Sequence, residues 1–420
     1  MKGKKQYLFA VLVLVLSPAT DSVWAVGKPT ANEDIPKCYK STNSETAISY
    51  CTRAIESGQL SGKSLAFAFY KRANGYYERG QYDRAIEDYN HVIGLNPNHA
   101  NAFSNRGATY ARKGEYDRAI ESYDEAIRLN PKHADAFSNR GVAYARKGDY
   151  DRAVENYDEA IRLNPKHAAA LYGRGNAYRR KGDYDRAIEN YDEALRLNPK
   201  HANAFSNRGV AYARKGDYDR AIENYDEALR LNPKHANALY NRGNAYRHKG
   251  DYDRAIENYD EAIELNPKHV DAISNRGLVH FYQGQFAAAV PDFSQAVKLT
   301  PTNLFRILLL YLAQARAGGH AQDDLAQATM GLDLGEWPGP IVSLYLGKVP
   351  EHVVFNAVVD IDPVKQRQKR CQAYFYVGEH LLIRQNSSEA AKMFRETMAT
   401  NTSILFEHEA AKAELRRLGN

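Results

Sequence analysis

A 34-residue period runs through the middle of this 420-residue chain and leaves few folds open to it. The triplet Asn-Arg-Gly stands at 105–107, 139–141, 207–209, 241–243 and 275–277, so every step is 34 residues or a multiple of it. Self-similarity at this spacing is typical of solenoids, in which each unit contacts only its neighbours. The register gives seven units, which begin near Ala66, Ala100, Ala134, Ala168, Ala202, Ala236 and Val270.

Each unit carries two segments with apolar or small residues at helical spacing. In the second unit these positions are Phe103, Gly107, Tyr110, Ala119, Tyr123 and Ala126. Gly114 separates the two segments, because glycine accepts the left-handed conformation that ends a helix. Pro131 follows the second segment, since proline cannot continue the hydrogen-bond ladder. We therefore expect a helix hairpin in every unit.

The hairpins resemble the tetratricopeptide repeat. In the fourth unit the pattern of large apolar, glycine, aromatic, alanine and proline positions is carried by Leu171, Gly175, Tyr178, Ala187, Tyr191, Ala194 and Pro199. Ala73 replaces the glycine in the first unit and His280 replaces the tyrosine in the seventh, as terminal repeats of a solenoid often do. The resemblance implies an all-α, right-handed superhelical solenoid that binds other proteins and has no catalytic role.

The chain divides into four regions on this interpretation. Residues 1–25 form a signal peptide, 26–65 an N-terminal cap with a half-repeat, 66–303 the seven repeats, and 304–420 a C-terminal helical cap. The last region contains one further repeat-like pair at about 371–404.

The first 25 residues indicate export. Three lysines precede an apolar stretch at 7–16, and Ala25 is the small residue after which a signal peptidase would cut. The apolar stretch is too short to span a bilayer comfortably, and no cysteine near the cut could accept a lipid. We expect a periplasmic or secreted protein without a transmembrane segment in the mature chain. In an oxidising compartment Cys38 and Cys51 would form a disulfide, and the alternative is two buried thiols.

The C-terminal region shows a second resemblance, to NlpI-type periplasmic lipoproteins. It is carried by short phrases at 310–313, 337–340, 345–347 and 374–379 and by scattered residues from Glu407 to Gly419. Proteins of that type are homodimeric adaptors that present substrates, including cell-wall hydrolases, to a periplasmic protease. The resemblance therefore implies such partners and a homodimer. This chain departs from the type because it lacks the lipid-acceptor cysteine and has more repeats.

The first helix of each tetratricopeptide unit lines the concave surface, so side chains there are candidates for a peptide groove. The asparagine that opens each triplet can both donate to and accept from a peptide backbone. These residues are Asn105, Asn139, Asn207, Asn241 and Asn275. The alternative is that they bridge neighbouring hairpins. Tyr172, Tyr240, Arg179 and Arg247 are further groove candidates, because aromatic and arginine residues anchor many interfaces. Their alternative is a solvated face.

Other repeated polar residues are expected to be structural. The arginines of the triplets should pair with carboxylates of adjacent second helices, such as those at 124–125. The histidines that follow Pro-Lys are turn residues, because repeat spacing keeps them too far apart to share a metal ion. They are His133, His167, His201, His235 and His269. We expect no cofactor and no metal.

Three hypotheses for function follow. The leading one is an exported adaptor that holds proteins or peptides in its groove. A cell-envelope assembly factor for pili or polysaccharide export differs from it only in the partner. An enzyme would have to hide its active site in 305–420, where we find no catalytic motif. The formal net charge of +6 is spread over interleaved acids and bases, so we expect no nucleic-acid partner.

Overall fold

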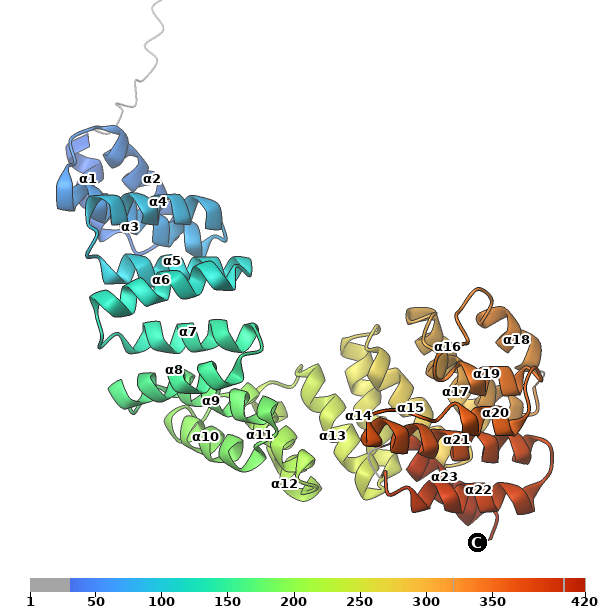
Figure 1. Cartoon of the computed structure of the whole chain (residues 1–420). Helices are drawn as coiled ribbons and strands as arrows, with labels where there is room; N and C mark the ends of the chain where they lie inside the picture. The colour runs from blue at the N-terminus through green and yellow to red at the C-terminus, as the bar shows by residue number, and fades with distance from the viewer. Residues whose placement is uncertain (1–30, 320, 403–404, 420) are drawn as a thin grey trace, which may run out of the picture. The chain divides into compact units, whose positions relative to one another are not determined.

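A computed structural model describes residues 31–319, 321–402 and 405–419. These residues form 23 helices and no strand, which confirms the all-α prediction (Figure 1). The predicted signal peptide and its cleavage point after Ala25 lie outside the described residues. None of the 23 helices is long and apolar enough to cross a membrane. The chain divides into two compact units, Met1–Ala143 and Tyr144–Asn420.

The first unit begins with a hairpin and continues with repeats. Its helices are α1 (Ala31–Lys40), α2 (Ser44–Glu56), α3 (Gly62–Glu78), α4 (Tyr82–Leu95), α5 (Ala100–Lys113), α6 (Tyr116–Leu129) and most of α7 (Ala134–Arg146). Helix α3 starts four residues before Ala66, because Ser61 adopts the extended conformation of a helix N-cap. The other first helices begin where the 34-residue register places them.

The second unit holds the remaining repeats and the C-terminal helices. The repeat helices are α8 (Tyr150–Leu163), α9 (Ala168–Lys181), α10 (Tyr184–Leu197), α11 (Ala202–Arg214), α12 (Tyr218–Leu231), α13 (Ala236–Lys249), α14 (Tyr252–Leu265), α15 (Val270–Tyr282) and α16 (Phe286–Leu299). The others are α17 (Leu304–Arg316), α18 (Ala321–Ala328), α19 (Gly339–Tyr345), α20 (Glu351–Asn356), α21 (Pro363–Ile383), α22 (Ser387–Ala399) and α23 (Phe406–Arg417).

In α5, α9, α11, α13 and α15 a glycine of the first helix faces an aromatic ring of the second helix. A Cβ atom on Gly209 would lie 2.7 Å from the ring of Tyr225, so no larger residue fits there without a shift. Gly378 of α21 meets Phe394 of α22 in the same way, at 2.7 Å. The C-terminal region therefore repeats the packing of the central hairpins. Its core is continuous with α15 and α16 and contains Phe281, Leu312, Phe375 and Phe394.

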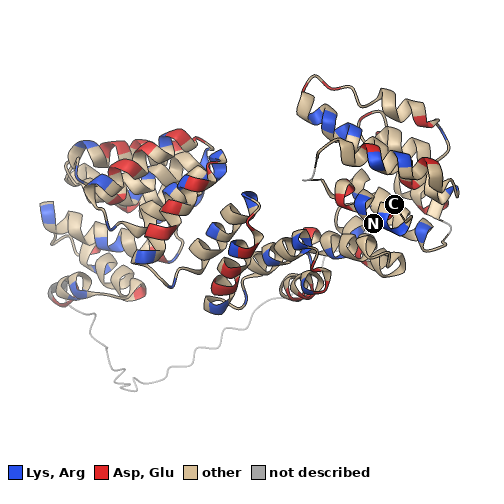
Figure 2. Cartoon of the chain, turned by 90° about the horizontal axis from the view of Figure 1, so that it is seen from below, with Lys and Arg blue, Asp and Glu red and all other residues tan. Residues whose placement is uncertain are grey.

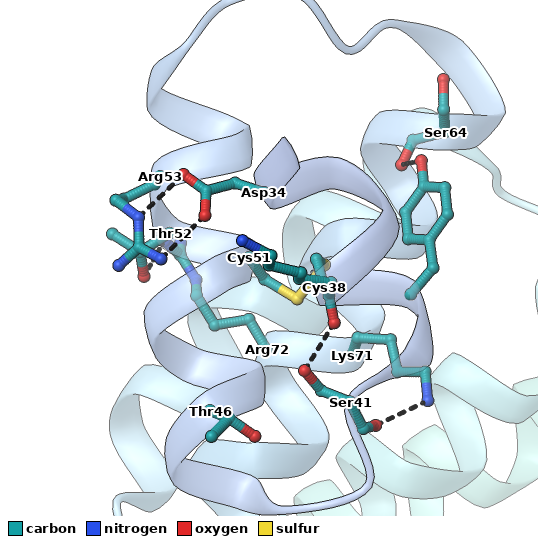
Figure 3. Close-up of a disulfide and its surroundings, with 12 residues drawn as sticks. Asp34, Cys38, Ser41, Thr46, Cys51, Thr52, Arg53, Ser64, Lys71 and Arg72 are labelled. Carbon is teal, nitrogen blue, oxygen red and sulfur yellow. Dashed lines mark hydrogen bonds and ion pairs between the residues drawn. A yellow bond between two sulfur atoms is a disulfide. The ribbon is translucent and has the colours of Figure 1, made fainter. Parts of the chain in front are cut away.

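A disulfide joins α1 to α2. Cys38 and Cys51 are both buried, with their Cα atoms 4.7 Å apart (Figure 3). Beside the disulfide, Arg53 donates two hydrogen bonds of 2.8 Å to Asp34. The guanidinium of Arg53 holds the pKa of this buried carboxyl below its ordinary value. The hairpin is thus closed by a covalent bond and by an ion pair.

We expect the double substitution Cys38→Ser/Cys51→Ser to lower the local stability of α1 and α2. The disulfide closes a loop with a sequence separation of 13 residues. Loop-closure entropy for a loop of that size corresponds to about 3 kcal/mol. Hydrogen exchange of the α1 and α2 amides measures the change, with α15 and α16 as the internal reference. Unchanged exchange in α1 and α2 would contradict the expectation.

Candidate functional site: the first-helix face

A polar network connects the first helices of consecutive repeats. Asn207 Nδ2 donates to Tyr172 Oη at 3.0 Å and to Asn176 Oδ1 at 2.8 Å. Tyr191 Oη of the second helix donates to the same Asn176 oxygen at 2.8 Å. The ring of His201 packs on Tyr172, with centroids 4.6 Å apart. Asn207 therefore fastens α11 to α9 and has no donor left for a ligand.

The same network occurs at two other places in the chain. Asn275 donates to Tyr240 at 3.3 Å and to Asn244 at 2.8 Å. In the first unit Asn105 donates to Tyr70 at 2.9 Å and to Asn74 at 3.1 Å. The side chains of Asn105, Asn207 and Asn275 therefore bridge neighbouring hairpins, which was the alternative to a role in peptide binding.

The remaining two asparagines of the triplets are different. Asn139 and Asn241 have no side-chain hydrogen bond to any residue that the structure describes. The cause lies in the preceding repeat. Asn207 donates to Asn176, which lies 31 residues earlier in the sequence. The residue 31 positions before Asn241 is Val210, whose side chain has no hydrogen-bond acceptor. The five asparagines thus do not form one uniform ladder, and Asn241 is free to contact a ligand.

The sequence did not lead us to predict a role for the asparagines that accept these hydrogen bonds, which are Asn74, Asn176 and Asn244. The available signal was a tyrosine followed four residues later by asparagine, which recurs at 172 and 240. The third copy begins at Tyr70, where the repeat is otherwise degenerate. This signal separates repeats that bridge to the next hairpin from repeats that do not.

We expect Asn207→Ala to destabilise α9 and α11 by about 1–3 kcal/mol, because Tyr172 and Asn176 lose their shared donor. Asn241→Ala provides the matched control at the same position of the next repeat, and should change local stability by less than about 0.5 kcal/mol. Hydrogen exchange of the α9, α11 and α13 amides distinguishes the two. Equal effects of both substitutions would contradict the assignment of Asn207 to a structural bridge.

Arg179 and Arg247 lie near the C-terminal ends of α9 and α13, at equivalent positions of two repeats. The Nε atom of each is buried and has no hydrogen-bond partner. Neither guanidinium forms an ion pair within the described part of the chain. Arg247 lines a pocket of about 510 Å³, together with Arg214, Tyr218, Tyr240, Asn241 and Asn244. The structure therefore brings four of the predicted groove residues, Tyr240, Asn241, Arg247 and Asn275, to one pocket.

His248 also lines this pocket and was not predicted as part of it. Its ring stacks on Tyr218, with centroids 5.0 Å apart and an interplanar angle of 6°. Arg247 Nη2 lies 3.2 Å from His248 Nε2. Partial burial, together with the charges of Arg247 and Arg214, lowers the pKa of His248 to about 4. The imidazole is therefore neutral at pH 7, and the positive charge of the pocket resides on the two arginines.

The arginines of the triplets form the structural bridges predicted for them. Arg242 donates to Asp226 at 2.6 Å, across 16 residues. The equivalent ion pairs are Arg140–Asp124, Arg174–Asp158, Arg208–Asp192 and Arg276–Asp260. Arg106 donates instead to Asn90 at 2.8 Å, because Asn90 stands where the other repeats have aspartate. The side chains of these arginines are therefore used in contacts between helices of the fold.

The turn histidines cap the first helices. The Nδ1 atoms of His167, His201, His235 and His269 accept the backbone N–H three residues ahead at 3.0–3.4 Å. His99 does the same for Ala102 at 3.1 Å. Within the described ranges no group of histidine, cysteine, aspartate or glutamate side chains has the arrangement of a metal site.

The C-terminal region contains buried carboxyl groups, which are the candidates for a catalytic site in this part of the chain. Arg316 donates to Glu379 at 2.7 Å and to Glu414 at 3.1 Å, and both glutamates are almost fully buried. Burial raises the pKa of Glu379 well above its ordinary value. Glu407 is 1% exposed and burial raises its pKa to about 7. Because these groups are enclosed in the core, the arrangement fits the joining of α17, α21 and α23 better than contact with a substrate.

We expect Glu407→Gln to stabilise α23 at alkaline pH. Both carboxylate oxygens of Glu407 lack a hydrogen-bond partner. With its folded pKa near 7 and an ordinary value of 4.5, the protonated form favours the fold, and that contribution is lost as pH rises through about 7. The substitution should therefore be neutral at pH 4 and raise local stability by roughly 3 kcal/mol at pH 8. Hydrogen exchange of α23 at both pH values measures it. Exposed Glu396 gives the control substitution Glu396→Gln, which should show no such dependence.

Acidic and basic residues follow one another along the same helices (Figure 2). Pairs three residues apart, such as Arg196–Glu193 and Arg230–Glu227, account for part of this pattern on the second helices. The interleaving agrees with the absence of a long basic run in the sequence. The unpaired arginines of the first helices are therefore a local exception.

Comparison with known proteins covers the repeats. A family model described as Tetratricopeptide repeat matches residues 70–134, 105–168, 138–202, 172–236 and 206–270, and a second model with that description matches 270–303. Together the matches span more than half of the chain.

Several solved structures are similar to parts of the chain. A crystal structure of YrrB, described as a TPR protein with an unusual peptide-binding site, shares 27% identity, covers 44% of this chain and 96% of YrrB, and has a TM-score of 0.39. A crystal structure of MamA shares 30% identity, covers 39% of this chain and 96% of MamA, and has a TM-score of 0.36. A tetratricopeptide repeat protein from Parabacteroides merdae shares 22% identity, covers 59% and 98% of the two chains, and has a TM-score of 0.47.

Proposed function

The chain belongs to the tetratricopeptide repeat family, whose repeats form protein-interaction scaffolds, and we propose that it holds segments of partner proteins on its first-helix face. The partner would lie along α9, α11, α13 and α15 of the second unit. The chain itself would carry out no chemical step. Its contribution is to present an ordered surface on which a partner segment is fixed.

One observation carries the proposal. The first-helix face of the second unit combines a pocket of about 510 Å³ with polar groups that the fold leaves unsatisfied. Asn241 has no hydrogen bond to a described residue, and the Nε atom of Arg247 has no acceptor. Neighbouring second helices differ, because many of their charged side chains are paired within the helix, as Arg230 is with Glu227. Polar groups without partners are what a binding surface must offer.

Site-specific photo-crosslinking in the native cells tests the proposal. A photoreactive amino acid at Asn241 replaces a side chain that the fold does not use. The matched control places the same amino acid at Glu223, which is exposed on α12. Discrete protein adducts from position 241, and few from position 223, would support a partner on the first-helix face. Adducts that form equally at both positions, or at neither, would contradict it.

We also propose the cellular setting that the sequence indicates. The basic start, the apolar stretch and Ala25 support export to the periplasm with cleavage of residues 1–25. The C-terminal likeness to NlpI-type adaptors supports a homodimer and partners among periplasmic proteases and cell-wall hydrolases. The intact mass of the protein recovered from the periplasmic fraction tests the first part, because a chain beginning at Val26 is expected. Light scattering of that protein tests the dimer.

A pilus or polysaccharide assembly factor is the second candidate function. It would use the same face, so the proteins captured from position 241 distinguish the two candidates. Envelope-assembly components among the adducts would favour it, whereas proteases or hydrolases would favour the adaptor.

A further inference from the structure

The pocket between α11, α12 and α13 contains two cations without an acidic partner. The other lysines and arginines of α11 and α13, and Lys215 directly after α11, are paired with a carboxylate of the preceding repeat. The pairs are Lys215–Asp185, Lys249–Asp219, Arg208–Asp192 and Arg242–Asp226. Arg214 and Arg247 line the pocket and form no ion pair with any residue described. Arg214 and Arg247 are thus the two basic side chains of α11 and α13 that lack an acidic partner within the described part of the chain.

Arg247 is a partly buried cation whose described surroundings contain no acidic side chain to balance its charge. Its side chain is half-buried and its Nε atom is buried without an acceptor. The groups around its guanidinium are His248, a neutral ring with a low pKa, and the uncharged phenol groups of Tyr240 and Tyr259. A buried donor without a partner costs free energy, and a charged one costs more than a neutral one. A ligand that brings a negative group would therefore remove a penalty that the free protein carries.

We propose that this pocket is a subsite for a carboxylate group in an acidic, extended segment of the partner protein. The inference rests on the proposed function and adds the chemical class of the segment. A guanidinium binds a carboxylate through two parallel N–H···O bonds, which gives orientation as well as affinity. The amide of Asn241, on the wall of the same pocket, can bond the adjoining peptide backbone.

The local charge pattern favours a peptide over a nucleic acid. Recognition of a nucleic acid requires a stripe of cations that follows many phosphates. Here two unpaired arginines stand among lysines that are already paired with aspartates. Such a cluster can neutralise one or two charges and no more.

The repeat structure also indicates the spacing of acids in the segment. Arg179 of α9, with Tyr172 and Asn176, repeats the arrangement of Arg247 with Tyr240 and Asn244 two repeats earlier. Neighbouring helices pack about 8–10 Å apart, so the two arginines lie on the order of 20 Å apart. An extended chain advances about 3.3 Å per residue, so this separation corresponds to about six residues. A segment with two acids at that spacing could reach both arginines.

The test uses the full processed chain and a displayed library of random 12-residue peptides. Selection is run on the wild type, on Arg214→Gln/Arg247→Gln, and on the control Arg196→Gln/Arg230→Gln. The control removes the same charge from exposed positions of α10 and α12. We expect the wild type and the control to enrich peptides with Asp or Glu, and the pocket variant to lose that preference. Far-ultraviolet circular dichroism verifies that all three proteins are folded.

Synthetic peptides then give the size of the effect. An enriched peptide should bind the wild type about tenfold more tightly than its Asn/Gln counterpart, and this difference should vanish in the pocket variant. Enriched peptides without acids, or an acid preference that survives in Arg214→Gln/Arg247→Gln, would overturn the inference and leave the proposed function standing. Failure to enrich any peptide, joined to a negative crosslinking result, would remove both. Polyphosphate or oligo(rA) that binds as tightly as the acidic peptide, and depends on the same arginines, would overturn the assignment to a peptide.

Discussion

Arg316→Met is expected to destabilise the C-terminal helices by about 3–5 kcal/mol. Arg316 of α17 is the residue that joins Glu379 of α21 to Glu414 of α23, across 63 and 98 residues of sequence. Glu379 is 0% exposed, and its other carboxylate oxygen already lacks a hydrogen-bond partner. Methionine fills the space of the arginine stem but leaves Glu379 as an uncompensated buried carboxyl. Removal of one partner of such a group is more damaging than replacement of the whole group.

The loss should depend on pH in a defined direction. Because burial raises the pKa of Glu379, the protonated form favours the fold, and this contribution is lost as pH rises through the folded pKa. The deficit of Arg316→Met should therefore be larger at pH 9 than at pH 5. Hydrogen exchange of α17, α21 and α23 measures it, and Arg384→Met at an exposed position of the same region is the control. A deficit that shrinks at pH 9, or one that Arg384→Met reproduces, would contradict the role assigned to Arg316.

Tyr225→Ala is expected to cost about 3–5 kcal/mol, the usual range for removal of a large buried aromatic side chain. Tyr225 is 1% exposed, and its ring lies against the backbone of α11 at Gly209. Alanine would leave a cavity between the two helices of the hairpin. Tyr184→Ala is the matched control, because Tyr184 is only half-buried at the start of α10.

The effect of Tyr225→Ala should remain local. In a repeat array the stability of each hairpin depends on its own packing and on its two neighbours. We expect faster amide exchange in α11 and α12, a smaller change in α9, α10, α13 and α14, and none in α21–α23. Because a long array need not unfold in one step, local exchange is a better measure than a single melting temperature. Uniform loss across the second unit would contradict nearest-neighbour stacking.

The repeat fold could be predicted from sequence because its signals are local and recur. Gly209 and Tyr225 lie 16 residues apart in one hairpin, and the same pair of positions returns in each unit. The bridge from Arg242 to Asp226 is equally regular. The 34-residue register therefore specified the hairpins, the core tyrosines and the structural arginines together.

The candidate site could be predicted only in part. Tyr240, Asn241 and Arg247 were identified as groove residues, but Asn207 and Asn275 are held in bridges. Whether an asparagine is free depends on a residue 31 positions earlier, which is Asn176 for Asn207 and Val210 for Asn241. The roles of Arg214 and His248 depend on which cations have acidic partners. That property belongs to the folded surface and has no local sequence pattern.

The C-terminal network could not be predicted at all. Arg316, Glu379 and Glu414 lie on three helices, at separations that follow no repeat. Each is an ordinary charged residue in its own segment. Only the packing of α17, α21 and α23 makes them buried and interdependent.

Hydrogen-exchange mass spectrometry of the purified protein, with and without a peptide selected from the library, tests the central claim most directly. A partner segment on the first-helix face should slow exchange most in α9, α11, α13 and α15, and less in α12, whose Tyr218 lines the pocket. Exchange in α10 and α14 should remain unchanged. Protection confined to the second helices, or to α17–α23, would show that the ligand lies elsewhere and would contradict the account.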